Sequence, residues 1–273
     1  MSALAAKLRQ LRTQSGQAAP VVPIKPSLSS DVLRLIQGRS RIQGGRQPLA
    51  SADRTVPGTE VSPGLFLTEA IVDWYRPTSM IDTTFARWKE PIAHHRLLHF
   101  DTETTGLAGG TGTRAWMIGA ADWLEDGRFR LRQLTITRMG AETDMLRMFA
   151  SWLQHDTILV SYNGKCYDSP LLKTRYRLAR LPCPLTGLGH LDLLHPVRRH
   201  WKGVWENCRL ATAERELLGV VREDDLPGSE APAAWLSYLR GGSAVNLRRV
   251  LTHNSQDLKS LAGVLLHLAT LPR

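Results

Sequence analysis

The sequence has few cysteines and no long apolar run. Its three cysteines (Cys166, Cys183 and Cys208) form no Cys-x-x-Cys pair, so they indicate neither a zinc site nor a disulfide framework. No apolar run approaches the roughly 18 residues that a membrane span needs. Residues 1–14 are interrupted by charge and lack the apolar stretch of a signal peptide. We therefore expect a cytoplasmic protein with a reduced environment and no membrane-spanning segment.

Aromatic residues are absent from residues 15–60, which are rich in Ser, Pro, Gly, Gln and Arg. Such a segment buries too little apolar surface to offset the entropy lost on ordering. Residues 1–60 carry nine Lys and Arg against three Asp and Glu, and the other 213 residues carry 26 against 22. We expect a basic, flexible region over 1–60, an extension over 61–96 that packs on the following domain, and a domain over 97–273.

The net charge of +10 favours a polyanionic partner, because basic contacts release the counterions condensed on a phosphate backbone. Acidic proteins and membrane surfaces would be attracted as well. Charge alone therefore leaves the partner open, although the basic region over 1–60 is expected to raise non-specific affinity for nucleic acid.

Apolar patterning predicts alternating strands and helices from Leu97 onward. Asp126-Gly127 is a strong hairpin signal between two of the strands. The expected strands are 64–70, 97–101, 115–124, 128–135 and 157–162, and the expected helices are 141–153, 169–179, 210–218 and 248–268. This alternation predicts an α/β fold with a mixed central β-sheet flanked by α-helices.

Two carboxylates follow the first buried strand of this domain. In an extended strand, residues i and i+2 point to one face, so Asp101 and Glu103 would direct their charges to one place. Two such charges repel unless a cation lies between them, and oxygen ligands are those that Mg²⁺ or Mn²⁺ prefers. The alternative is an Asp at a strand end beside a Glu or Thr that caps a helix.

Two further acidic residues stand in comparable places. Asp168 follows a buried strand and precedes a helix, where it could also serve as an N-cap. His253 and Asp257 are four residues apart and share a helix face, although surface or structural roles are open for both. The four carboxylates together, in this order and with a histidine beside the last, are hard to explain as capping.

The segments FDTETTGL (100–107), SYNGKCYDSPLL (161–172) and HNSQD (253–257) resemble the three exonuclease motifs of the DEDD superfamily. The wider pattern, including residues 109–113, 208–219 and 222–230, resembles the bacterial YprB-like family of RNase H-like domains from about Leu97 to Leu268. The resemblance implies an RNase H-like fold.

This resemblance also implies roles for the acidic residues. Two divalent cations, Mg²⁺ or Mn²⁺, would be held by Asp101, Glu103, Asp168 and Asp257, with His253 as the general base. His253 stands four residues before Asp257, which is the spacing of the Tyr subtype, whereas the His subtype uses five.

Residues near these motifs are candidates for contact with nucleic acid. They are Thr104, Gly106 and Leu107 at the start of a glycine-rich run, Tyr162 and Asn163 after the second buried strand, and the basic Lys165, Lys173 and Arg175. The alternatives are a purely conformational role for the glycine-rich run, core packing for the aromatic residue, and solvated helix faces for the basic residues. For Asp192 we expect a structural role, and 222–225 is predicted to be an exposed charged loop without an assigned function.

The predicted function is metal-dependent hydrolysis of DNA or RNA, by a 3′→5′ exonuclease acting on single-stranded ends. The alternatives are a structure-dependent endonuclease on the same carboxylates, a non-catalytic nucleic-acid-binding module, and a phosphodiesterase acting on short oligonucleotides. The sequence leaves open the choice between DNA and RNA.

Overall fold

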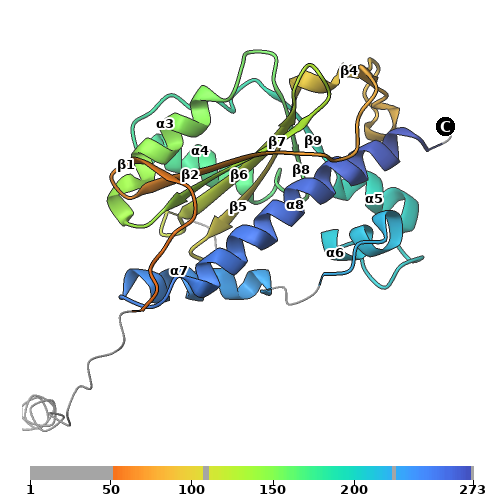
Figure 1. Cartoon of the computed structure of the whole chain (residues 1–273). Helices are drawn as coiled ribbons and strands as arrows, with labels where there is room; N and C mark the ends of the chain where they lie inside the picture. Colours follow the sequence, from red (N-terminus) through yellow and green to blue (C-terminus); the bar gives the residue numbers. More distant parts are fainter. Residues whose placement is uncertain (1–51, 107–110, 223–225, 272–273) are drawn as a thin grey trace, which may run out of the picture. The chain divides into compact units, whose positions relative to one another are not determined.

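A seven-stranded mixed sheet forms the centre of the computed structural model, which describes residues 52–106, 111–222 and 226–271 (Figure 1). The strands are β1 (Thr59–Ser62), β2 (Leu65–Val72), β5 (Leu97–Thr104), β6 (Ala115–Trp123), β7 (Phe129–Ile136), β8 (Ile158–Ser161) and β9 (Gly189–Asp192). Their order is β1-β2-β7-β6-β5-β8-β9. β5 pairs antiparallel with β6 and parallel with β8. A small second sheet consists of β3 (Met80–Ile81) and β4 (Ile92–Ala93).

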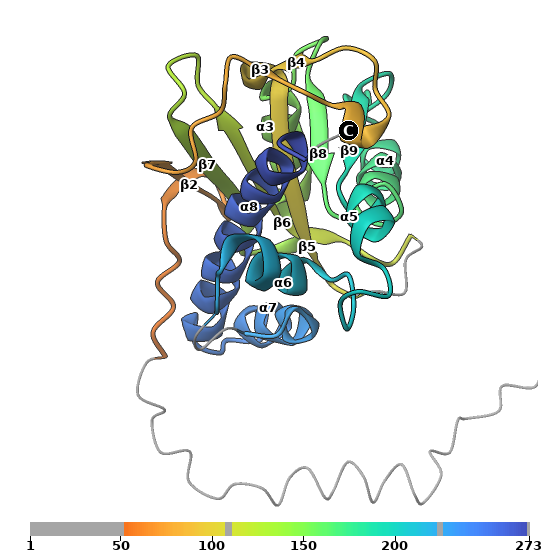
Figure 2. The same cartoon turned by 90° about the vertical axis from the view of Figure 1, so that its right-hand side faces the viewer.

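Helices cover both faces of the large sheet. α3 (Glu142–Ser151) and α4 (Asp168–Leu178) lie on one face, and α8 (Val245–Ala269) crosses the other (Figure 1). α6 (Leu210–Ala213), which continues as a π-helical turn over Glu214–Leu218, and α7 (Ala231–Leu239) lie beside α8, whereas α5 (Leu194–Trp201) follows β9 (Figure 2). Short 3₁₀ turns occupy Thr84–Ala86, His94–Arg96, Met139–Ala141 and Gly228–Glu230. Within the described ranges, no helix is both long and apolar enough to cross a bilayer.

Alternation along β5 decides which side chains reach α8. The ring of Phe100 packs against Phe149 of α3, with 6.3 Å between the ring centroids. Asp101, the next residue, accepts a hydrogen bond from Asn254 of α8. Because neighbouring side chains of a strand point to opposite faces, the acidic positions of β5 lie on the α8 face, whereas Phe100 packs toward α3.

Most predicted elements are present, with shifted ends. The hairpin at Asp126-Gly127 is confirmed, with Gly127 at a φ of 79°. The helix predicted over 210–218 is confirmed and ends at Gly219, whose φ is 65°. β5 is longer than predicted and continues to Thr104. β1, β9, α5 and α7 were missed, because short or mostly apolar segments carry no clear period.

β1 and β2, which precede Leu97, belong to the large sheet. β2 pairs with β7 from Leu65↔Ile136 to Val72↔Phe129. Residues 52–56, predicted to be flexible, lie against the helices: the Arg54 guanidinium lies 4.1 Å from the centroid of the Tyr238 ring. The remainder of the predicted flexible region, residues 1–51, lies outside the described residues.

Candidate active site

Asp101 lies at the centre of the candidate site. Its Oδ2 accepts a 2.9 Å hydrogen bond from Nδ2 of Asn254. Burial raises the pKa of the Asp101 carboxyl well above its usual value, and three neighbouring carboxylates, those of Asp257, Asp168 and Glu103, raise it further. The four predicted acidic residues, which come from β5, α4 and α8, are therefore close enough for their charges to interact.

Asp168 is the first residue of α4, and its carboxylate faces β5. Its Oδ1 accepts a hydrogen bond from Oγ1 of Thr102. Burial raises the pKa of Asp168 to about 6, although the Thr102 hydrogen bond opposes this. Reading Asp168 as the N-cap is wrong, because Tyr167 holds that position and no side chain caps the helix. A carboxylate in the first turn is still favoured by the helix dipole.

The loop that carries the second motif is held by Asp192 of β9. The Asp192 carboxylate accepts hydrogen bonds from the backbone N–H groups of Asn163 at 2.7 Å and Lys165 at 3.1 Å. Asn163 has a φ of 66°. A Cβ on Gly164 would lie 3.0 Å from Oδ2 of Asp168 and 2.5 Å from Oγ of Ser161. The structural role predicted for Asp192 is confirmed, and it fixes the loop that precedes Asp168.

His253 and Asp257 share a face of α8, as their spacing predicted. Nε2 of His253 lies 3.4 Å from Oδ2 of Asp257. Arg222 contacts both: its Nη2 donates to Oδ1 of Asp257, and its Nη1 lies 3.0 Å from Nδ1 of His253. The exposed-loop prediction is wrong for Arg222, whose side chain is only 13% exposed, while residues 223–225 lie outside the described residues.

Arg222 is held in place by a carboxylate that the sequence did not indicate. Nε and Nη2 of Arg222 donate to the two carboxylate oxygens of Glu214, at 2.8 and 2.6 Å. Glu214 also accepts a hydrogen bond from the hydroxyl of Ser260 on α8. Such a two-pronged pair fixes the guanidinium plane, so Arg222 is a defined part of the site.

The donor set suits a hard divalent cation. Carboxylate oxygens are the protein ligands that Mg²⁺ prefers. The pKa of Asp101 is raised first by burial and then by the charges of Asp257, Asp168 and Glu103. In the part of the chain that the structure describes, however, no three His, Cys, Asp or Glu side chains converge as a preformed metal site. In this arrangement Asn254 and Arg222 supply hydrogen bonds to Asp101 and Asp257.

A cavity of about 210 Å³ opens beside Asp168. Thr104 and Gly106, both predicted to contact nucleic acid, line it, and Leu107 lies outside the described residues. The remaining lining residues are Thr102, Thr113, Tyr167, Asp168 and Leu171. Tyr167 is 58% exposed, so its ring is open to a ligand from solvent.

Two predicted contacts with nucleic acid do not fit the structure. Arg175 is only 5% exposed, and its guanidinium donates to both Glu142 oxygens, at 2.5 and 2.6 Å, and to the carbonyl of Thr111 at 3.0 Å. Tyr162 packs against the core, and its hydroxyl donates to the Cys208 carbonyl. Both side chains are engaged inside the protein, whereas Lys165 and Lys173 are exposed as predicted.

Comparison with known proteins assigns the fold to a family. A model described as RNase H superfamily matches residues 98–269. The chain belongs to the RNase H superfamily. It is 39% identical over 176 residues to protein YprB of Bacillus subtilis (strain 168), an alignment that covers 64% of this chain and 42% of that protein. The chain therefore matches less than half the length of this relative.

The superfamily assignment confirms the RNase H-like fold predicted from the motifs, and all three motifs lie within the matched range. Among solved structures, this chain is similar to the family B DNA polymerase from the hyperthermophilic archaeon Pyrobaculum calidifontis, with a TM-score of 0.48 and 17% sequence identity. The similarity covers 62% of this chain and 24% of the polymerase.

Proposed function

We propose that this protein is a metal-dependent nuclease that removes nucleotides from the 3′ end of single-stranded DNA or RNA. One observation carries the proposal: Asp101 is buried beside Glu103 of its own strand and beside Asp168 and Asp257 of two helices, and burial and these three carboxylates raise its pKa. A phosphodiester would be repelled by four such charges, and divalent cations remove that repulsion. A nuclease-type domain of the RNase H superfamily is the scaffold on which this site stands.

In this proposal, Asp101, Glu103, Asp168 and Asp257 hold two Mg²⁺ or Mn²⁺ ions. When bound, such ions provide a water-derived nucleophile near neutral pH and offset charge on the leaving oxygen. His253, with Nε2 3.4 Å from Oδ2 of Asp257, takes the proton from the attacking water once Arg222 has released its Nδ1. The polarity and the two-ion arrangement follow the resemblance to the DEDD exonuclease motifs.

The cavity beside Asp168 receives the terminal nucleotide. Tyr167 offers an exposed ring at its rim, and stacking on an aromatic ring binds single-stranded bases without strong sequence preference. The exposed Lys165 and Lys173 contact strand phosphates. Single strands suit this arrangement because a terminal base that stacks on Tyr167 must be free of a base-pairing partner.

The test is hydrolysis of 5′-labelled and 3′-labelled single-stranded DNA and RNA with Mg²⁺, Mn²⁺ or EDTA. We expect ladders from 5′-labelled strands and released label from 3′-labelled strands, both abolished by EDTA. Asp101→Asn keeps the side-chain shape and should abolish cleavage. Asp126→Asn is the matched control, because Asp126 is an exposed acid in the β6–β7 turn.

The same assay separates the alternatives. Cleavage of closed circular single strands would replace the exonuclease with an endonuclease. Binding without cleavage under every metal condition would favour a non-catalytic nucleic-acid-binding module. Activity confined to the shortest substrates would indicate a phosphodiesterase acting on short oligonucleotides.

A further inference from the structure

A row of polar positions crosses the sheet from its second strand to the site. Thr68 of β2 is the cross-strand neighbour of Gln133 on β7, and Gln133 is the neighbour of Gly119 on β6. Gly119 is in turn the neighbour of Asp101 on β5. Four adjacent strands thus place these residues at one level on the face that α8 covers.

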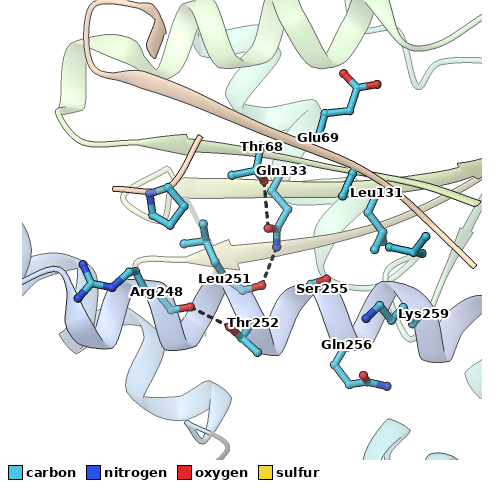
Figure 3. Close-up of a pocket in the computed structure, with 13 residues that line it drawn as sticks. Thr68, Glu69, Leu131, Gln133, Arg248, Leu251, Thr252, Ser255, Gln256 and Lys259 are labelled. Atoms are coloured by element: carbon cyan, nitrogen blue, oxygen red, sulfur yellow. Dashed lines mark hydrogen bonds between the residues drawn. The ribbon is translucent and has the colours of Figure 1, made fainter. Parts of the chain in front are cut away.

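Hydrogen bonds connect this row through one residue of α8. Oγ1 of Thr68 lies 3.2 Å from Oε1 of Gln133. Nε2 of Gln133 donates to the Leu251 carbonyl at 2.8 Å and to Oδ1 of Asn254 at 2.9 Å. Nδ2 of Asn254 donates to Asp101 at 2.9 Å. Figure 3 shows the bonds of Gln133 to Thr68 and to Leu251, beside a groove of about 480 Å³.

The carbonyl of Leu251 fixes which group donates and which accepts in each of these hydrogen bonds. The carbonyl of Leu251 only accepts hydrogen bonds, so the nitrogen of the Gln133 amide must face α8. The oxygen of Asn254 must then face Gln133, and its nitrogen must face Asp101. The amide of Asn254 therefore presents a donor, rather than an acceptor, to the Asp101 carboxylate.

Gly119 provides the space that this arrangement needs. A Cβ at Gly119 would lie 2.0 Å from Oδ1 and 2.8 Å from Cγ of Asn254, which is too close for any side chain. Asn254 itself is fully buried, and both ends of its amide are hydrogen-bonded. The glycine on β6, the glutamine on β7 and the asparagine on α8 form one unit beside Asp101.

We propose that Asn254 is a positioning residue, which orients the Asp101 carboxylate toward a divalent cation, and that Gln133 sets its amide in the orientation that does so. The inference rests on the proposed function, because it assigns Asp101 as a metal ligand. Partners that orient a metal-binding carboxylate typically change metal affinity or activity about ten- to a hundredfold when removed. Here Gln133, the residue that sets the orientation, is on β7, and β6 separates it from Asp101 on β5.

The experiment measures the dissociation constant of Mn²⁺ by calorimetry on the full chain. Asn254→Leu keeps the branched shape and removes the donor without adding charge. Gln133→Glu removes the donor that fixes Asn254, so the amide can turn its oxygen toward Asp101. Thr252→Glu is the control for the added charge, because Thr252 lines the same groove, is exposed, and its hydroxyl donates to the Arg248 carbonyl of its own helix.

We expect Asn254→Leu to weaken Mn²⁺ binding at least about tenfold, Gln133→Glu to weaken it several-fold, and Thr252→Glu to leave it unchanged. The double variant Asn254→Leu/Gln133→Glu should bind no more weakly than Asn254→Leu, since Gln133 acts through Asn254. Circular dichroism and the melting temperature without metal establish that each variant is folded.

Unchanged Mn²⁺ affinity in the folded single variants, or independent losses that add in the double variant, would overturn the inference alone. If Mn²⁺ binds and the variants weaken it as expected, but no nucleic acid is cleaved, the inference stands and the exonuclease proposal fails. Absence of Mn²⁺ binding by the unmodified chain would overturn both. Should Asn254→Leu not fold, Gln133→Glu decides the question, because it changes one amide to a carboxylate of the same shape.

Discussion

Arg222 and His253 are in direct contact, with Nη1 of the arginine 3.0 Å from Nδ1 of the histidine. A guanidinium only donates hydrogen bonds, so Nδ1 is the acceptor and, in the neutral ring, Nε2 carries the hydrogen. That nitrogen faces Oδ2 of Asp257 at 3.4 Å. A histidine in this state cannot take a proton on Nε2, so its use as a base through this nitrogen requires Arg222 to release Nδ1.

We predict that the effects of Arg222 and Glu214 on the free energy of unfolding are strongly coupled. Glu214 is 1% exposed, and removing one partner of a buried ion pair costs about 3–5 kcal/mol because the other charge is left buried. We expect Arg222→Met to lower the free energy of unfolding by this amount, and Arg222→Met/Glu214→Gln to recover part of it, since Asp257 also loses its contact with Arg222. Urea denaturation measures both. A double variant no more stable than Arg222→Met would contradict the pairing.

The contact of Arg175 with Glu142 predicts a structural rather than a phosphate-binding role. Arg175→Met should lower the free energy of unfolding by about 1–3 kcal/mol, because the buried Glu142 loses its two-pronged partner but keeps the hydrogen bond from Arg114 at 2.7 Å. Arg177→Met, at an exposed position of the same helix, should change it by less than about 0.5 kcal/mol. Urea denaturation of the two variants tests this, and equal stabilities would show that the buried pair contributes nothing.

Tyr167 predicts a stacking contribution to substrate binding. Tyr167→Ala should weaken binding of a single-stranded 3′ end by about 1–3 kcal/mol, the usual value of one stacked base. Tyr167→Phe keeps the ring and should retain the affinity. Fluorescence anisotropy with Mg²⁺ in the Asp101→Asn background, where no hydrolysis is expected, compares the two. Equal losses in both variants would assign the effect to the hydroxyl instead of the ring.

We predict that the lowered pKa of His190 makes the folded protein less stable at acidic pH. Burial lowers the pKa of His190 to about 4 from the usual 6.5, and Nε2 lies 2.7 Å from Oγ of Ser161. Below about pH 6.5 the unfolded chain binds a proton at this residue that the folded chain refuses until about pH 4. Stability present above pH 6.5 is therefore lost as the pH falls toward 4, by up to about 3 kcal/mol.

The variant His190→Gln removes this titration and leaves the other ionisable groups in place. The difference in unfolding free energy between the two proteins, measured at pH 7.5, 6 and 5, isolates the histidine. We expect the original chain to lose more stability than the variant over this range. Parallel pH profiles would show that His190 is protonated as readily in the folded protein as in the unfolded chain.

The parts of the site that follow a local period were predictable from sequence. Alternation along a strand placed Asp101 and Glu103 on one face, and helical spacing placed His253 beside Asp257. The hairpin signal at Asp126-Gly127 set the pairing of β6 with β7 correctly. In each case the geometry depends on residues within a few positions of one another.

The partners of these residues were not predictable, because a period states which face a side chain occupies and not what it meets there. Asn254 stands inside the third motif, but its role depends on the missing side chain at Gly119, 135 positions earlier. Arg222 was taken for part of an exposed loop, since nothing local marks its pairing with Glu214. Arg175 was assigned to phosphates because the buried Glu142 belongs to another helix.

The pairing of β2 with β7 has a consequence for any shortened version of the chain. A fragment that begins at residue 98, where the family match starts, lacks the strand that covers β7 along its length. The exposed backbone N–H and C=O groups of β7 would then form an open edge, which invites pairing with other copies and aggregation. A shortened version of the chain should therefore retain β2, which begins at Leu65.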